Sequence, residues 1–267
     1  MRPYLQTLEM EESGIRFSVV DNLCFPAHWH LQCEIVYVID GIFCAGVNRQ
    51  QYELKQGDML AVGSNEIHYY STRDSRILLI IFHPEIVGQE GGWPQGGCFT
   101  APVVRRDGID APARELLAYA VSQTEANSLI QRGIVNLLCA FLQERAGFVA
   151  GGAETAIPHK LVQEAIRYID QNYQEEISLA RIAGQINVSK YHLSRKFKEY
   201  AGMSIPQHVN SVRLYHAEQL LREGSKSISD IAYECGFNSL RNFNRVFFGK
   251  HGQAPAAFRR GGQTKRK

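Results

Sequence analysis

Residues 231–260 read IAYECGFNSLRNFNRVFFGKHGQAPAAFRR, and residues 182–202 carry a related pattern, IAGQINVSKYHLSRKFKEYAG. Both stretches begin with Ile-Ala and continue through Arg-x-Phe to a glycine. The two alanines are 49 positions apart and the two arginines are 50 apart, so the second copy has one additional residue in its turn. A near-repeat of this kind predicts one supersecondary unit that is used twice.

Each copy has the pattern of a helix-turn-helix. A small alanine lets the first helix cross close to the second, and the turn follows at a residue that tolerates positive φ. An apolar residue then fills the angle between the helices, a capping residue starts the second helix, and apolar residues at i and i+4 face the core. In chain order these are Ala183, Asn187, Val188, Ser189, Leu193 and Phe197 in the first copy, and Ala232, Gly236, Phe237, Asn238 or Ser239, Phe243 and Phe247 in the second. The opposite face of each second helix is polar and basic.

Charge is divided unevenly along the chain. The 267 residues carry a formal net charge of +2, but residues 1–150 contain 11 Lys and Arg against 17 Asp and Glu, whereas residues 151–267 contain 18 against 10. The second part is therefore basic, which predicts that it alone meets a polyanion. A helical repeat without a DNA function is the alternative, and two matched copies in a basic segment favour DNA.

Composition limits the class of protein. The chain is 45% hydrophobic and 21% charged, as expected for two globular domains. No run approaches the ~18 apolar residues of a membrane span, and no apolar leader segment is evident. The six cysteines form no Cys-x-x-Cys pair and are interpreted as small buried hydrophobes in a reducing compartment. We therefore expect a cytoplasmic protein.

Up to residue 82 the sequence is strand-like. Short β-prone runs separated by Gly, Asn and Asp predict an antiparallel barrel or sandwich. The expected strands are 15–20, 34–39, 52–54, 59–62, 67–70 and 77–82.

Helices are expected from residue 113 onward, at 113–123, 129–144 and 159–172. The second has one apolar stripe at three- and four-residue spacing, which packs either on its own barrel or on a partner subunit. The stripe consists of Leu129, Ile130, Ile134, Leu137, Leu138 and Phe141. Residues 147–157 are expected to be a flexible linker, and Pro158 is expected in the first turn of the third helix.

The segment from His159 to Arg260 resembles the DNA-binding domain of the AraC family of bacterial transcription regulators. The similarity is carried by residues 231–237, Arg245-Val246-Phe247, Gly252-Gln253-Ala254-Pro255 and Phe258-Arg259. Cys235 and Gln253-Ala254 depart from the family's usual residues, away from the DNA face. The resemblance implies a long helix at 206–221 between two subdomains. It also implies recognition helices at 189–200 and 239–250, which enter successive major grooves about 34 Å apart.

The start of each recognition helix is expected to reach the edges of the bases. These residues are Lys190, Tyr191, Ser194 and Arg195 in the first helix and Leu240, Arg241, Asn244 and Arg245 in the second. Arginine binds guanine and asparagine binds adenine through paired hydrogen bonds, and leucine contacts a thymine methyl. Pairing of Arg195 and Arg245 with acidic neighbours is the alternative. Lys196, Lys198 and Lys250 are expected on phosphates.

The N-terminal part resembles the cupin family. His28-x-His30-x3-Glu34-x6-Gly41 is similar to the first cupin motif, and Gly57 with His68 is similar to part of the second, in which Gly63 and Asn65 replace the expected proline and glycine. This resemblance implies a sensory barrel, which commonly precedes the DNA-binding domain in AraC-type regulators.

Strand periodicity gives an independent argument about this motif. If residues 28–40 are extended, His28, His30 and Glu34 share one face, and Tyr37 lies on the other. The effector-binding residues are therefore expected to be His28, His30, Glu34, His68 and Tyr70. The first four form a set that can also hold Fe, Mn, Ni or Zn, and a purely structural role is a third alternative. Because AraC-type barrels generally bind organic effectors without catalysis, we expect no metal, no cofactor and no enzymatic activity.

The sequence thus predicts an α+β protein of two domains. Residues 1–146 form a cupin-like antiparallel β-barrel with two C-terminal helices, which binds the effector and dimerises. A linker at 147–157 leads to an all-α domain at 158–261 with two helix-turn-helix units, and 262–267 form a tail.

The predicted function is that of a sequence-specific transcription regulator. Its expected partners are double-stranded DNA, a small-molecule effector such as a sugar or aromatic acid, a second copy of the chain and, for an activator, RNA polymerase; no membrane is expected. Two alternatives remain: a metal-dependent cupin oxygenase or isomerase fused to a DNA-binding module, and a regulator without an effector.

Overall fold

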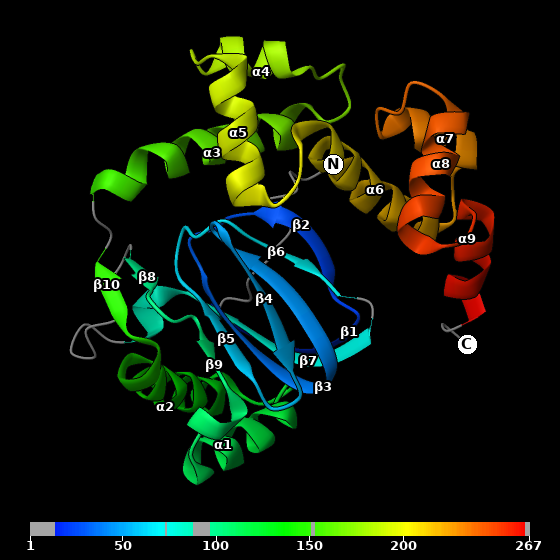
Figure 1. Cartoon of the computed structure of the whole chain (residues 1–267). Coiled ribbons are helices and arrows are strands. Elements are labelled where there is room, and N and C mark those ends of the chain that lie inside the picture. The colour runs from blue at the N-terminus through cyan, green and yellow to red at the C-terminus, as the bar shows by residue number, and fades with distance from the viewer. Residues whose placement is uncertain (1–13, 73, 88–96, 151–152, 265–267) are drawn as a thin grey trace. The chain divides into compact units, whose positions relative to one another are not determined.

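The computed structural model describes residues 14–72, 74–87, 97–150 and 153–264 (Figure 1). The chain divides into two compact units, one built mainly from residues 5–163 and the other mainly from residues 164–267. None of the helices in the described part of the chain has the length and apolar character of a membrane span.

The first unit is an antiparallel β-structure followed by two helices. Its strands are β1 (Ile15–Asp21), β2 (Cys24–His28), β3 (Cys33–Val47), β4 (Gln50–Lys55), β5 (Met59–Val62), β6 (His68–Ser71), β7 (Asp74–Phe82) and β9 (Val103–Val104). They form an eight-stranded sheet in the order β1-β7-β3-β5-β9, while β2 pairs with β6, and both β4 and β6 also pair with β3. Short 3-10 helices follow at Pro84–Ile86 and Arg106–Gly108. An antiparallel N-terminal barrel is therefore what the sequence predicted.

Strand β3 joins the two halves of this sheet. Its first half pairs with β5 and β7, and its second half pairs with β4 and β6. The sequence predicted that the strand would end before Gly41, but it continues to Val47. Gly41 has φ of +79° and a Cβ there would lie 2.3 Å from the Asp74 carbonyl oxygen, so a glycine allows β3 to bend against β7 without a break. Strand β2, at Cys24–His28, was not predicted.

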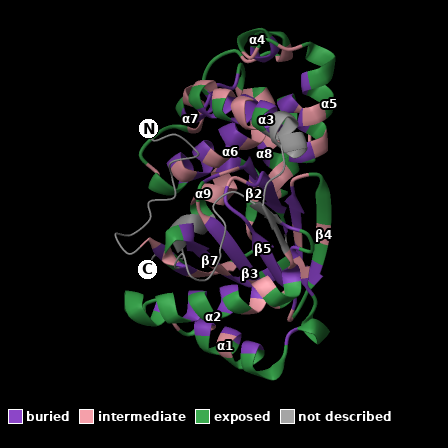
Figure 2. Cartoon of the chain, turned by 90° about the vertical axis from the view of Figure 1, so that its left-hand side faces the viewer, coloured by how far each residue is buried: buried purple, intermediate pink, exposed green. Residues whose placement is uncertain are grey.

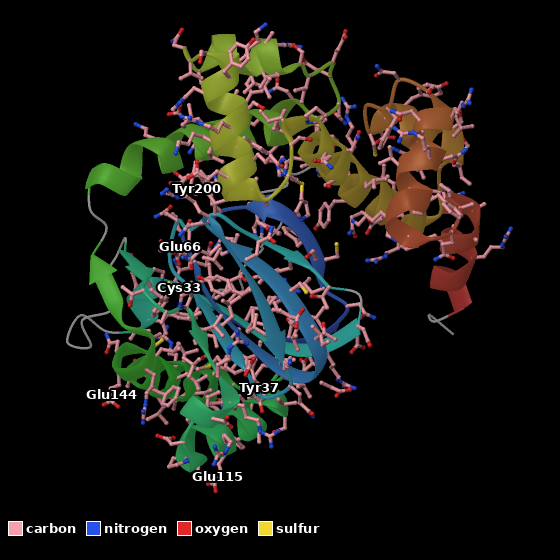
Figure 3. The ribbon with its side chains drawn as sticks, viewed as in Figure 1. Cys33, Tyr37, Glu66, Glu115, Glu144 and Tyr200 are labelled. Carbon is pink, nitrogen blue, oxygen red and sulfur yellow. The ribbon has the colours of Figure 1, made fainter. Side chains whose placement is uncertain are left out.

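The two faces of β3 belong to different hydrophobic cores. Val36 and Val38 lie in a cluster with Phe43 and Tyr70. Ile35 lies in a second cluster that includes the helical residues, and Tyr37 packs against it at the helix-covered end of the sheet (Figure 3). The alternation predicted for this strand is therefore confirmed, and Glu34 has the parity of the first cluster.

Helices α1 (Ala111–Val121) and α2 (Ser128–Ala146) cover one side of the sheet (Figure 1). Asp110 and Asn127 cap their N-termini by accepting hydrogen bonds from backbone amides. The outer sides of both helices are exposed (Figure 2), and Glu115 and Glu144 point outward from them (Figure 3).

The apolar stripe predicted on α2 is divided between two environments. Ile134 and Leu138 are buried in the core beneath the helix, whereas Leu129 and Leu137 are 79% and 61% exposed. Part of the stripe therefore packs on the barrel of the same chain, and part remains uncovered.

The described residues of the segment predicted as a linker include a strand and the start of a helix. Residues Phe148–Ala150 form β10, which pairs with β8 (Gly97–Phe99). Helix α3 (Ala153–Asn172) begins five residues before Pro158, so the prediction of Pro158 in the first turn is wrong. The strand pairing joins segments some fifty residues apart, which local sequence patterns do not indicate.

The second unit is helical. It contains most of α3, then α4 (Leu179–Gln185), α5 (Lys190–Ala201), α6 (Ile205–Glu223), α7 (Ile228–Glu234), α8 (Leu240–His251) and α9 (Pro255–Thr264). Helices α4 and α5 form the first predicted helix-turn-helix, and α7 and α8 form the second. The long predicted helix is α6. The predicted tail is ordered as helix up to Thr264, and residues 265–267 lie outside the described residues.

The two helix-turn-helix units have equivalent turns. Asn187 and Gly236 have φ of +55° and +83°, as the repeat predicted. The residue after each turn donates its amide to the carbonyl of the repeat's alanine, 3.0 Å away in both copies. Ser189 and Ser239 accept hydrogen bonds from the amides three residues on, which starts α5 and α8. The sequence predicted Asn238 or Ser239 as the N-cap of α8, and in the structure the cap is Ser239.

Candidate ligand site and nucleic-acid interface

Four potential ligand side chains meet inside the barrel. His28 ends β2, His30 lies between β2 and β3, Glu34 lies in β3 and His68 begins β6. The side chains are at most 8% exposed, and one potential ligand atom from each lies within 4.8 Å of the others. We refer to these four residues as the histidine–glutamate cluster. The structure thus brings together the predicted residues, although not on one extended strand.

The pairing of β2 with β6 brings the cluster together. His28 is the cross-strand partner of His68, and Phe25 is the partner of Tyr70. The imidazole centroids of His28 and His68 are 4.0 Å apart, and those of His30 and His68 are 5.0 Å apart. The sequence predicted that His28, His30 and Glu34 would share one face of a single extended strand. In the structure the pairing of β2 with β6 brings His28 to His68.

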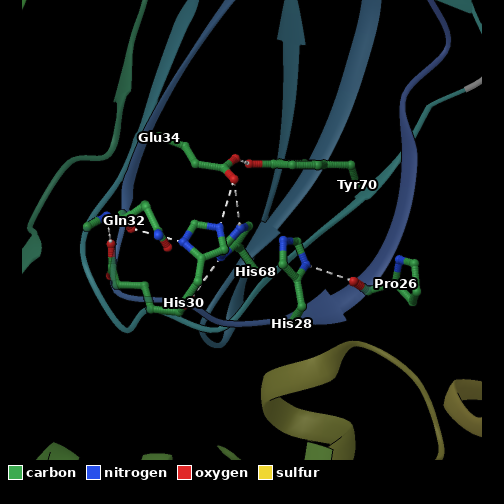
Figure 4. Close-up of polar contacts among 9 residues, drawn as sticks. Pro26, His28, His30, Gln32, Glu34, His68 and Tyr70 are labelled. Carbon is green, nitrogen blue, oxygen red and sulfur yellow. Dashed lines mark hydrogen bonds and ion pairs between the residues drawn. The ribbon is translucent and has the colours of Figure 1, made fainter. Parts of the chain in front are cut away.

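Glu34 is at the centre of the polar contacts (Figure 4). Its Oε1 lies 2.9 Å from His30 Nε2 and 3.5 Å from His68 Nε2. Its Oε2 accepts a hydrogen bond from the Tyr70 hydroxyl. Tyr70, predicted as a secondary pocket residue, therefore orients the carboxylate.

Each imidazole of the cluster is fixed by a backbone carbonyl. Nδ1 of His28, His30 and His68 donates to the carbonyl oxygens of Pro26, Gln32 and Glu66, at 2.9, 3.1 and 2.8 Å. Because a carbonyl can only accept, Nδ1 carries a proton in all three rings. The nitrogen left for another partner is Nε2 in each case. These hydrogen bonds could not be predicted from the sequence. Every residue has a backbone carbonyl, and only the fold determines which one a histidine ring meets.

The electrostatics of the cluster are dominated by burial and by mutual interaction. Burial, with the nearby charges of His68 and His30, lowers the pKa of His28 well below its usual value. Burial alone would raise the pKa of Glu34, but the charge of His68 and the hydrogen bond from His30 outweigh it and hold that pKa well below its usual value. Burial would lower the pKa of His68, but the Glu34 charge raises it. Glu34 is therefore an anion in the interior.

A second carboxyl supports the turn before β6. Glu66 accepts hydrogen bonds from Asn48 Nδ2 at 2.7 Å and from the Gly63 amide at 2.6 Å. Burial raises its pKa despite these hydrogen bonds. The turn positions the Glu66 carbonyl, which accepts the hydrogen bond from His68 Nδ1, so Glu66 is a supporting residue that the sequence did not reveal.

The predicted base-reading residues lie on α5 and α8. Seven of the eight are exposed, namely Lys190, Tyr191, Ser194, Arg195, Arg241, Asn244 and Arg245, and Leu240 is half-buried. Tyr191 is 88% exposed. Beneath them, Leu193 and Phe197 of α5 and Phe243 and Phe247 of α8 are buried, which leaves the polar side of each helix outward.

The charged side chains of α8 differ in their partners. Arg245 donates to Asn242 Oδ1 at 2.9 Å, which is a neutral partner within the same helix. Lys250, which is predicted to contact phosphate, pairs with Glu218 of α6 at 2.7 Å in the chain alone. His251 lies 2.9 Å from the same carboxylate, so this end of α8 is tied to α6.

Comparison with known families covers both units. Residues 182–261 match the model of a helix-turn-helix domain, and residues 15–137 match that of an AraC-like ligand binding domain. The chain belongs to the AraC family. It is a DNA-binding transcription regulator with a ligand-binding domain, which confirms the resemblance and the function predicted from the repeat.

Individual relatives of this AraC-family chain agree with that assignment. It is 24% identical over 254 residues to the HTH-type transcriptional activator RhaS of Enterobacter sp., covering 89% of this chain and 88% of the relative. It is 26% identical over 246 residues to the HTH-type transcriptional activator RhaR of Escherichia coli, covering 88% and 87%. Among solved structures, an apo variant of ToxT from Vibrio cholerae matches with a TM-score of 0.55 at 14% identity, covering 92% of this chain and 97% of that one. The last likeness concerns the fold alone.

Proposed function

We propose that this regulator reads DNA with α5 and α8 in successive major grooves and that a ligand in the barrel controls the reading. The observation that carries this proposal is the pair of equivalent helices, each with a buried apolar side and an exposed polar side. A helix presented in this way can enter the major groove, where its first residues meet the edges of the bases.

The base-contacting residues we propose are the eight predicted from the sequence. Their positions in the first two turns of α5 and α8 support this role, because that part of a recognition helix lies deepest in the groove. The exposure of Arg195 and Arg241 further supports it. Lys196 and Lys198 remain proposed phosphate contacts.

Substitution of the arginines tests base reading. Arg195→Ala and Arg241→Ala are each expected to weaken specific binding by about 1–3 kcal/mol and to relax the preference at one base pair. Fluorescence anisotropy with the operator and with single-base variants of it measures both effects. Arg16→Ala, on an exposed position of β1, is the matched control and should bind like the unmodified chain. Unchanged affinity and base preference in both test variants would reject this role.

The relatives support a more detailed proposal. Both are named transcriptional activators, so we propose activation through contact with RNA polymerase and action in the cytoplasm, where the DNA is. We further propose a homodimer through α1 and α2, with an effector at the histidine–glutamate cluster and Tyr70. The chain's membership of a family of regulators supports a binding role for the barrel in preference to catalysis.

A further inference from the structure

We propose that the second helix-turn-helix unit binds a small amphipathic carboxylate in a groove between α7, α8 and α9. The groove has a volume of about 660 Å³, and ordinary ligand pockets have roughly 300–1,000 Å³. It belongs to the helical unit and shares no residue with the histidine–glutamate cluster. The inference goes beyond the proposed function, and its regulatory meaning rests on the proposed role of α8 in base reading.

The lining of the groove is apolar. One side of α8 and the first residues of α7 and α9 form it, and these three helices lie together in one unit (Figure 1). Leu240, Asn244 and Phe248 follow one another at four-residue spacing on α8 and therefore share that side. A hydrocarbon chain or ring bound here would release water from apolar surface on both partners. The apolar lining residues are Ile228, Leu240, Phe248, Ala254, Pro255 and Ala256.

Phe248 is the largest apolar side chain of the groove and is open to solvent. Its side chain is 58% exposed, whereas Phe243 and Phe247 of the same helix are fully buried. The core of the unit is therefore formed by other phenylalanines, and the ring of Phe248 is left for a bound molecule to cover.

The charges around the groove select an anion. Arg245 donates to the neutral Asn242 Oδ1 at 2.9 Å and forms no ion pair within the described part of the chain, so its charge is available to an external carboxylate. Helix α9 begins at Pro255, which places the positive end of its dipole at the same groove. None of the lining residues is acidic. A carboxylate with an apolar body matches both the charge and the lining, whereas a DNA phosphate matches only the charge.

A molecule in this groove would compete with DNA. Asn244 and Arg245 line the groove and are also two of the four residues of α8 proposed to reach the edges of the bases. The carboxylate and the base pair thus require the same side chains. Binding of the two should be mutually exclusive, and the concentration of the carboxylate would set the fraction of the chain that is free to bind DNA.

Calorimetric titration of the full chain with sodium 2-naphthoate tests the site. This rigid aromatic carboxylate should bind with a dissociation constant of about 1 mM or lower, as expected for a ligand of its size. Two comparison compounds separate the contributions. We expect 2-naphthylmethanol, which lacks the charge, and acetate, which lacks the rings, to bind at least ten-fold more weakly.

Variants show whether binding takes place in the groove. Phe248→Ala removes an apolar wall and should weaken naphthoate binding by roughly ten-fold. Arg245→Gln removes the charge and should have a similar effect. Tyr233→Ala, at an aromatic side chain of α7 that is 57% exposed and does not line the groove, is the matched control and should bind like the unmodified chain. Circular dichroism verifies that each variant is folded.

Competition with DNA tests the regulatory meaning. Naphthoate at ten times its dissociation constant should raise the apparent dissociation constant for the operator duplex by about ten-fold. Sodium acetate at the same concentration controls for ionic strength. Phe248→Ala should require roughly ten-fold more naphthoate for the same effect, because its groove binds the carboxylate more weakly.

Four results would overturn the inference. They are no binding of naphthoate, equal binding by the groove variants and the unmodified chain, saturation with naphthoate without an effect on duplex binding, and loss of transcription activation by Phe248→Ala in a chain that binds no naphthoate. The last result would assign the groove to a protein partner. The proposed function fails separately, since a chain that binds naphthoate in the groove but no duplex would retain this site and lose its role on DNA.

Discussion

His208, on α6, lies buried beneath the first recognition helix. Its ring is edge-on to Phe197 of α5, with centroids 5.3 Å apart, and neither ring nitrogen has a hydrogen-bond partner. Burial lowers its pKa to about 3. The folded chain therefore holds this histidine neutral. At a pH between the pKa in the folded chain and the higher pKa in the unfolded chain, only the unfolded chain binds the proton.

The pH dependence of stability follows from this difference. The stability that a neutral His208 contributes is fully present above about pH 6.5, the pKa of histidine in the unfolded chain. It is lost as the pH falls toward 3, the pKa in the folded chain. Between pH 7 and pH 5 the free energy of unfolding should decrease by roughly 2 kcal/mol through this group. Urea unfolding followed by circular dichroism measures it, with His208→Leu as the comparison. A variant with the same pH slope as the unmodified chain would contradict the assignment.

Gly236 makes a second prediction at the scale of one residue. It lies in the turn between α7 and α8 with φ of +83°, and a Cβ there would be 2.6 Å from the Tyr173 carbonyl oxygen. Gly236→Ala should therefore destabilise the helical unit by about 1–3 kcal/mol from backbone strain, with the steric clash adding to it. Urea unfolding checks this value. Gly184→Ala in α4 has open space for its Cβ and should be neutral or stabilising by up to about 1 kcal/mol. Equal stability of the two variants would show that the turn relaxes freely.

At the scale of elements, Arg213 contacts both the loop before the first helix-turn-helix and the turn of the second. Arg213 of α6 donates to the carbonyls of Tyr173 and Glu175, both at 2.7 Å, and its guanidinium lies over Phe237 of the second turn. The loop between α3 and α4 is therefore held by α6 and packs against the α7–α8 turn. Arg213 therefore links the segment before the first helix-turn-helix to the turn of the second.

At the scale of the whole molecule, α2 retains an apolar surface. Leu129 and Leu137 are exposed on a helix whose other side is already buried in the barrel. We expect a dimer to cover these side chains, because apolar side chains that are exposed on an otherwise packed helix can be buried at an interface.

A charge on this surface tests the expected dimer. Leu137→Glu should convert the dimer into a monomer at micromolar concentration, since the charge would be buried without a partner. Sedimentation velocity measures the change. Ile42→Glu, on an exposed apolar position of β3, is the matched control and should leave the dimer intact. An unmodified chain that is monomeric with and without DNA would contradict the prediction.

The amino-acid sequence by itself determined the helical unit and its repeat. The turns at Asn187 and Gly236, the serine caps and the i, i+4 apolar pairs all act over one or two helical turns, so their spacing in the chain is their spacing in space. For the same reason the alternation along β3 was predictable from period two.

Only the tertiary structure decided how the histidine–glutamate cluster forms. His28 and His68 meet because β2 pairs with β6, and β3 reaches both halves of the sheet because it bends at Gly41 without ending. Nothing in the local sequence indicates which distant strands pair. The same holds for β10, in the predicted linker, which pairs with the distant strand β8. Hydrogen bonds to backbone carbonyls, which orient all three imidazoles, depend on this long-range packing and not on residue type.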